Sequence, residues 1–114
     1  VRYVYGVGAG PGRSGGGVLE PGNAIIKHDL VRQRVEVGRL GATKATAEAV
    51  FVADPGRERD EDGGWLVSFV YDAAVDRSEL AVTDAQDVQA GPIARVLLPQ
   101  RVPFGFHGNW FPAA

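Results

Sequence analysis

Short apolar runs recur along the chain, and residues typical of turns separate them. The runs of strand length cover 2–7, 24–30, 49–53, 65–71, 78–84 and 93–98. No stretch shows the i, i+3, i+4 apolar spacing of an amphipathic helix. The pattern predicts an all-β fold of short strands joined by turns.

Two further segments are less regular. Residues 31–37 alternate between valine and charged residues, which predicts a half-exposed edge strand that Gly38 and Gly41 end. Residues 42–47 are rich in Ala and Thr and have no apolar stripe at helical spacing. We interpret this second segment as a connection between strands.

The residues at 49–53, 65–71 and 80–83 are apolar on both faces of the strands they predict. Such strands normally lie in a parallel sheet covered by helices, but this chain predicts no helices. Stacked sheets can cover both faces instead, as the four-stranded blades of a β-propeller do. The last four strands start near 49, 65, 79 and 93 and predict one antiparallel blade. The first three then belong to the preceding blade.

Two blades alone would leave large apolar faces bare. We therefore expect the sequence to be part of a larger propeller, or a piece that packs on another copy. The sequence begins at Val1, contains no methionine and has no signal-like segment. These features agree with a piece of a longer chain.

Composition narrows the function classes. The chain has 114 residues, enough for one domain, and no cysteine, which excludes disulfides and thiolate metal sites. A net charge of −2 excludes a nucleic-acid binder that works by bulk basicity. No apolar run approaches the ~20 residues of a membrane span. Ten arginines against two lysines, with much Ala, Gly and Val, indicate a GC-rich bacterial genome.

Two motifs suggest binding sites, but neither has the context it needs. Residues 10–15 match G-x-G-x-x-G, yet Gly16, Gly17 and Pro21 follow, where a dinucleotide site needs a helix to start. We interpret the glycine-rich stretch as a surface loop. The acidic run 60–62 lacks the alternate spacing of a calcium loop. It predicts a solvated hairpin connection.

The two histidines differ in their surroundings. His28 lies near a strand end, is expected to be exposed and is given no role. His107 stands among glycines and aromatic residues, where a neutral imidazole can bind a metal. A hydrogen-bonded core histidine is the alternative. A catalytic metal needs about three or more protein ligands, and this chain cannot supply the others.

Glu48 directly precedes an apolar strand. One interpretation is an exposed carboxylate at a strand end. The other is an acceptor that orients a metal-binding histidine through its second ring nitrogen.

The C-terminal segment Phe104-Gly105-Phe106-His107-Gly108-Asn109-Trp110 resembles the end of the carotenoid cleavage oxygenases. That family includes apocarotenoid- and stilbene-cleaving dioxygenases and the retinal pigment epithelium isomerase. Further segments resemble the family in the right order, and together they cover nearly the whole chain: 3–6, 26–30, Glu48 with 50–52, 61–68 and 78–80.

The resemblance implies a seven-bladed propeller with Fe(II) on its axis, held by four histidines. His107 occupies the position of the last ligand, and Glu48 that of a glutamate that orients a ligating histidine upstream. Phe104 and Trp110 would line the apolar approach to the metal, with packing in the propeller core as the alternative. The chain would then comprise a partial blade (1–41), a complete blade (48–98) and a metal-ligand segment (99–114).

The implied activity of the longer protein is oxidative cleavage of a conjugated C=C bond of a carotenoid, apocarotenoid or stilbene by O₂. The first three histidines would lie upstream, so we expect the piece alone to be inactive. We expect no nucleic-acid partner, a cytoplasmic location in a bacterium, and contact with a membrane surface for substrate uptake. The alternatives are a non-catalytic binding or scaffold domain with His107 in its core, and an isomerase that keeps the iron.

Overall fold

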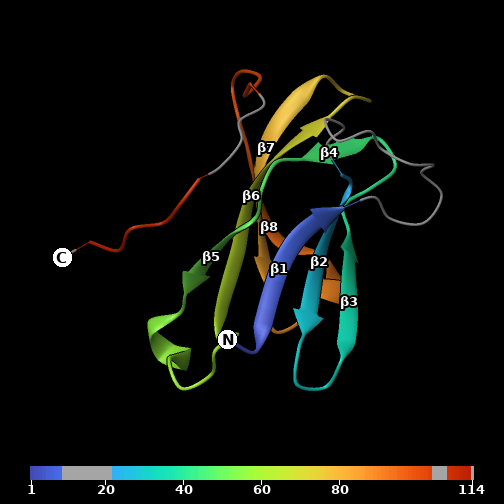
Figure 1. Cartoon of the computed structure of the whole chain (residues 1–114). Helices are drawn as coiled ribbons and strands as arrows, with labels where there is room; N and C mark the ends of the chain where they lie inside the picture. Colours follow the sequence, from blue (N-terminus) through green and yellow to red (C-terminus); the bar gives the residue numbers. More distant parts are fainter. Residues whose placement is uncertain (9–21, 104–107, 114) are drawn as a thin grey trace.

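The chain folds into two antiparallel sheets, drawn in Figure 1 as a computed structural model that describes residues 1–8, 22–103 and 108–113. The glycine-rich stretch falls mostly outside these residues. The N-terminal sheet has three strands in the order β1-β2-β3. Their bounds are β1 (Tyr3–Gly8), β2 (Ala24–Asp29) and β3 (Arg34–Arg39).

The C-terminal sheet has the order β4-β6-β7-β8, and β5 also pairs with β6. β4 and β5 pair with opposite ends of the same long strand. Two short 3-10 helices, η1 (Pro55–Arg57) and η2 (Val88–Ala90), follow β5 and β7. No helix in the described part of the chain is long and apolar enough to cross a membrane. The strands are β4 (Lys44–Thr46), β5 (Val50–Ala53), β6 (Gly64–Asp72), β7 (Arg77–Asp84) and β8 (Pro92–Leu97).

The all-β prediction is confirmed, and the four evenly spaced strands predicted for one blade are β5, β6, β7 and β8. The interpretation of 42–47 as a connection is wrong in part, because Lys44–Thr46 forms β4 and pairs with the end of β6. A three-residue strand is too short to show a period of two. Its pairing depends on β6, which the local sequence does not reveal.

The prediction of an edge strand over 31–37 is also wrong in its bounds. β3 does lie at the sheet edge, but it runs from Arg34 through Gly38 to Arg39. The residues before it form the turn of the β2–β3 hairpin, where Gln33 has a φ of 52°. Asp29 Oδ1 accepts hydrogen bonds from the backbone N–H groups of Val31 and Arg32, both at 3.1 Å. This Asx turn reverses the chain before the valine alternation can continue as a strand.

The core lies between the two sheets. Ile25 on β2 packs with Leu66 on β6, and Ala85 and Val88 complete the cluster. The rings of Tyr5 and Phe51 stack at its edge, with centroids 5.7 Å apart. The other face of each sheet points away from this core.

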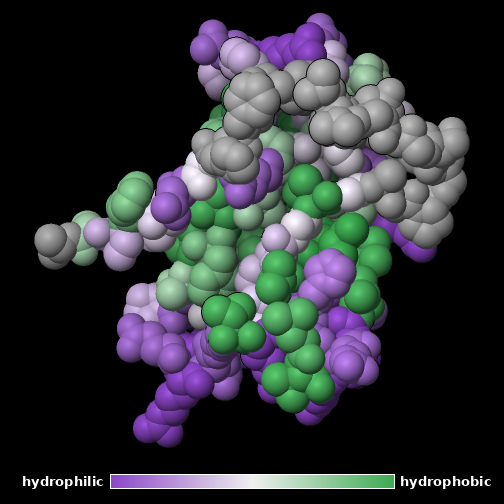
Figure 2. Space-filling model, in the orientation of Figure 1, coloured by the Kyte–Doolittle hydropathy of each residue, from purple (hydrophilic) through white to green (hydrophobic). Residues whose placement is uncertain are grey.

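Both outward faces are apolar in part. On the N-terminal sheet Val4 and Val35 are exposed on this face, and Figure 2 shows hydrophobic side chains over the region where Figure 1 draws β1. On the C-terminal sheet Phe69 and Val96 are exposed. These faces agree with the expectation that further layers pack on each side in a larger protein.

The acidic turn is a connection, as predicted, but it is not merely solvated. Glu61 Oε2 accepts hydrogen bonds from the backbone N–H groups of Arg2 (2.7 Å) and Tyr3 (2.8 Å). Asp62 forms an ion pair with Lys27 on β2. The turn therefore joins the two sheets.

Candidate functional site

The described residues include two of the four predicted site residues. Glu48 and Trp110 both line one pocket. His107 and Phe104 lie outside the described residues, so their predicted roles stay predictions. His28 is exposed, as expected, on the outward face of the N-terminal sheet.

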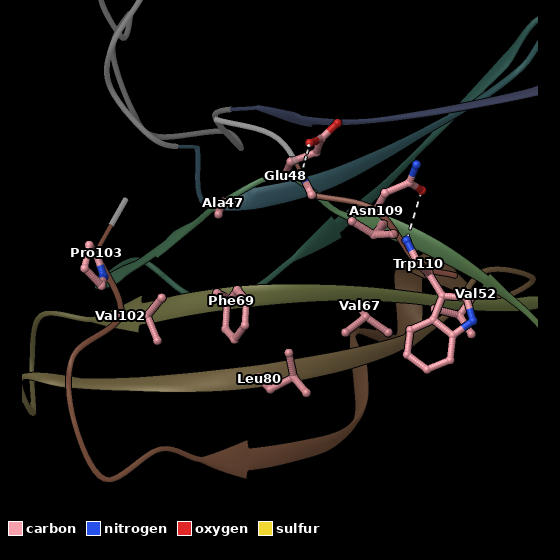
Figure 3. A pocket seen from close by; sticks show the side chains of 12 residues that line it. Ala47, Glu48, Val52, Val67, Phe69, Leu80, Val102, Pro103, Asn109 and Trp110 are labelled. Carbon is pink, nitrogen blue, oxygen red and sulfur yellow. Dashed lines mark hydrogen bonds between the residues drawn. The ribbon is translucent and has the colours of Figure 1, made fainter. Parts of the chain in front are cut away.

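The pocket is a cavity of about 480 Å³ on the outward face of the C-terminal sheet. Apolar strand residues form one wall, and the C-terminal segment forms the other (Figure 3). The wall on the sheet consists of Val50, Val52, Val67, Phe69 and Leu80. The opposite wall consists of Val102, Pro103 and 108–110.

An irregularity between β4 and β5 explains why a carboxylate reaches this apolar pocket. Thr46 pairs with Val70 and Val50 pairs with Val67, so the three residues 47–49 lie opposite only two, 68 and 69. This is the arrangement of a β-bulge, which changes the direction of side chains locally.

The bulge places two consecutive side chains on the same side. Ala47 and Glu48 both line the pocket, whereas Ala49 packs against the core between the sheets. In a regular strand that kept the facing of Thr46, Glu48 would point into the core instead. The backbone N–H of Ala47 still donates to the carbonyl of Phe69 at 3.0 Å, so the bulged segment remains attached to β6.

Glu48 contacts the C-terminal segment through a hydrogen bond. Its Oε2 accepts from the backbone N–H of Gly108 at 3.1 Å. Gly108 directly follows His107 in the sequence. The structure therefore brings Glu48 to the segment that carries the predicted metal ligand.

Trp110 lies at the edge of the pocket, with 54% of its surface exposed. The Asn109 side chain accepts a hydrogen bond from the Trp110 backbone N–H at 2.9 Å (Figure 3). Chemically, the pocket is an apolar cavity with one carboxylate at its edge. Among the described residues, no group of three or more His, Cys, Asp or Glu side chains could hold a metal.

Sequence reasoning missed the apolar wall formed by Val67, Phe69 and Leu80, because it predicted that both faces of these strands would be covered. It also missed the buried position of Lys27. The sequence did contain a signal for it, because Lys27 is a charged residue within the apolar run 24–30. The Lys27 ammonium lies over the Tyr3 ring, 4.4 Å from its centroid.

A second, polar pocket of about 240 Å³ lies beside Lys27. Four of its charged residues form two ion pairs: Lys27 with Asp62 at 2.7 Å, and Arg2 with Asp29 at 2.9 Å. The hydrogen bonds from Arg2 hold the pKa of Asp29 far below its ordinary value. These ion pairs connect different parts of the fold.

The family model for RPE65, the retinal pigment epithelial membrane protein, matches residues 1–112. The apocarotenoid-15,15'-oxygenase of Synechocystis sp. is 37% identical over 109 residues, which cover 96% of this chain and 21% of that protein. The carotenoid cleavage oxygenase of Mycobacterium tuberculosis is 38% identical over 111 residues, which cover 97% of this chain and 22% of that protein. The chain thus spans about a fifth of the length of these relatives.

Solved structures agree with the sequence matches. A variant of the Synechocystis apocarotenoid oxygenase superposes with a TM-score of 0.85 at 36% identity, covering 99% of this chain and 22% of that one. The cobalt-substituted form of that oxygenase superposes with a TM-score of 0.84 at 37% identity, again covering 99% and 22%. The two sheets are therefore part of the fold of those enzymes, and the chain belongs to the RPE65 and carotenoid cleavage oxygenase family.

Proposed function

We propose that the longer protein containing this chain is a non-haem Fe(II) dioxygenase. It would cleave a conjugated C=C bond of a carotenoid, apocarotenoid or stilbene. One O₂ is consumed, and each carbon of the broken double bond receives one oxygen atom, so both products are carbonyl compounds. The observation that carries the proposal is the family match over residues 1–112.

Two features of the relatives support the proposal. Curated relatives are carotenoid and apocarotenoid cleavage oxygenases. One superposing structure is a cobalt-substituted enzyme, so that relative has a metal site. A metal-dependent cleavage enzyme is consistent with both.

The described residues fit a shared metal site better than a complete one. Glu48 reaches the backbone of Gly108, next to His107, and a carboxylate is a common partner of ligating imidazoles. His107 would supply one ligand, and three histidines from the upstream part would supply the others. The chain would thus contribute one quarter of the ligand set.

Fe(II), when bound, supplies the position at which O₂ is activated. Glu48 would accept a hydrogen bond from the ring N–H of an upstream imidazole and so fix the tautomer and orientation of that ring. Phe104 and Trp110 would hold an apolar polyene by contact with their rings, because such a substrate offers no charge to bind. The apolar strand residues that line the pocket would favour contact with such a substrate over contact with water.

Iron analysis of the longer protein tests the proposal. Wild type is expected to retain iron, and His107→Ala to bind it at least about tenfold more weakly. His28→Ala is the matched control, because it removes the other histidine of the chain, to which no ligand role is assigned. Unchanged iron content in His107→Ala would contradict the proposal and favour the scaffold alternative.

Product analysis separates cleavage from isomerisation. With apocarotenoid and stilbene substrates, two carbonyl fragments per molecule are expected; a rearranged product of unchanged carbon number would indicate an isomerase. Residues 1–114 alone, given Fe(II), are expected to show no turnover. Robust cleavage by the piece would show that the assumed ligand count is wrong.

The proposal includes a location. We propose a cytoplasmic enzyme of a bacterium that takes its apolar substrate from a membrane surface. Cell fractionation and co-sedimentation with lipid vesicles test this part independently of the metal.

A further inference from the structure

The chain leaves β8 through a turn whose two ends both contact Ser78 on β7. At the first end, the backbone N–H of Leu98 donates to the carbonyl oxygen of Ser78 at 3.0 Å. At the second end, the backbone N–H of Val102 donates to the hydroxyl oxygen of Ser78 at 2.9 Å. One residue of β7 therefore closes a turn of five residues, 98–102.

The two hydrogen bonds differ in origin. Glu79 pairs with Leu97 in the ladder between β7 and β8, so the bond from Leu98 extends that ladder by one residue. The bond from Val102 forms after the ladder has ended, and it needs a side chain as acceptor. The Ser78 hydroxyl thus attaches the chain to the sheet a second time.

Ser78 lies on the face of the sheet that carries the apolar pocket. Leu80, two residues further along β7, lines that pocket, and alternate residues of a strand share a face. Ser78 is 1% exposed. Burial of a hydroxyl costs free energy unless a hydrogen bond compensates it. The bond to Val102 therefore explains why a polar residue stands on this face.

A second contact holds the same turn from the neighbouring strand. Tyr71 on β6 pairs directly with Ser78. The Arg101 guanidinium lies over the Tyr71 ring, 4.3 Å from its centroid, where the face of the ring attracts a cation. This cross-strand pair therefore holds two consecutive residues of the turn, Arg101 and Val102.

The closed turn determines where the C-terminal segment begins its path over the sheet. Val102 and Pro103 line the pocket, as does Phe69 on β6 (Figure 3). His107 comes five residues after Val102, and five residues span at most about 18 Å. A fixed Val102 therefore limits the region in which the backbone of His107 can lie.

We propose that Ser78 is a positioning residue that fixes the start of the segment leading to His107. Its carbonyl oxygen and its hydroxyl close the turn 98–102, so that Val102 enters the pocket at one place. The inference rests on the proposed function only for the assignment of His107 as a metal ligand.

Hydrogen exchange in the metal-free longer protein, measured by mass spectrometry at single-amide resolution, tests the turn directly. In Ser78→Ala the Val102 amide loses its acceptor and is expected to exchange about three- to tenfold faster than in wild type. The Leu98 amide donates to the backbone of residue 78, which the substitution keeps, so its rate should not change. A rise confined to Val102 reports local release of the segment and not general unfolding.

Ser68→Ala is the matched control. Ser68 is a buried serine of the same sheet, 2% exposed, and its hydroxyl has no hydrogen-bond partner in the described part of the chain. This variant should leave the Val102 rate at the wild-type value. An unchanged Val102 rate in Ser78→Ala, or an equal rise in Ser68→Ala, would overturn the proposal. If Ser78→Ala does not fold, Ser78→Cys decides, because a thiol is a weak acceptor: a wild-type rate there overturns the proposal.

Co(II) absorption connects the turn to the metal. Co(II) loaded into the longer protein is expected to give visible bands whose energies depend on the coordination geometry. These bands should shift in Ser78→Ala and stay unchanged in Ser68→Ala, although each variant loses one buried hydroxyl. An unchanged spectrum in Ser78→Ala would show that the turn does not position the ligand and would overturn the proposal. Wild type that binds neither Co(II) nor iron would instead contradict the proposed function, and the Val102 exchange rates would still decide whether Ser78 holds the segment.

Discussion

Lys27 and Asp62 form an ion pair that joins the two sheets, with Lys27 Nζ 2.7 Å from Asp62 Oδ2. Only 5% of the Lys27 side chain is exposed. The same ammonium donates to the carbonyl of Ala85 at 2.8 Å and lies 3.8 Å from Glu36 Oε2. Lys27 is thus a buried cation surrounded by acceptors from three parts of the chain.

Lys27→Met should therefore destabilise the protein, although methionine fills a similar volume. The substitution removes the cation, and among the residues that the structure describes it leaves Asp62 with the Gln86 side chain as its side-chain hydrogen-bond donor. We expect a loss of about 2–4 kcal/mol in the free energy of unfolding, measured by denaturant titration. Arg59→Met is the control, since Arg59 is exposed, and it should change stability by less than about 0.5 kcal/mol. Equal stabilities of the two variants would contradict the prediction.

Acid should unfold the protein partly through the same pair. Burial acts to raise the pKa of Asp62, but hydrogen bonds from Lys27 and Gln86 outweigh it and lower the pKa. A carboxyl whose pKa is lowered on folding adds stability above its unfolded pKa, and this stability is lost as the pH falls through the folded value. The thermal unfolding temperature of wild type should thus decrease when the pH is lowered below about 4. Lys27→Met should show a smaller fall, and a parallel pH profile would contradict this account.

Gly38→Ala tests the close approach of β3 to η2. A Cβ at Gly38 would lie 2.4 Å from the carbonyl oxygen of Val88, where neither backbone can yield easily. We expect a loss of about 1–3 kcal/mol, measured by thermal unfolding. Gly6→Ala is a matched control in another strand, because nothing lies within 4 Å of its added Cβ. If both variants unfold at the same temperature, this contact does not limit the packing.

Thr83→Val should stabilise the protein. Thr83 is 1% exposed, and its hydroxyl has no hydrogen-bond partner in the part of the chain that the structure describes. Replacing the hydroxyl by a methyl group removes an unsatisfied polar group, and we expect a gain of about 1 kcal/mol. Thr43→Val should instead lower the thermal midpoint, because the Thr43 hydroxyl donates to Asp72 Oδ1 at 2.8 Å. Destabilisation by Thr83→Val would point to a partner in the longer protein.

The sequence predicts most strands because their apolar runs and turn residues are local signals. β4 and the bulge escaped prediction because both depend on pairing with β6, more than 15 residues away in the sequence. Glu48 was singled out from the sequence, but only the bulge explains how it reaches the pocket. The roles of His107 and Phe104 follow from the resemblance of the C-terminal segment to the family and remain predictions.

The number of residues between Thr46 and Val50 is itself constrained, although this segment lies at the surface. Removing any one of them would restore even pairing along β6 and exchange the inward and outward residues on one side of the deletion. Phe51 would lose its place beside Tyr5, or Thr46 would leave the interior. Insertions and deletions are commonly tolerated in surface connections, but here the residue count itself is under structural constraint.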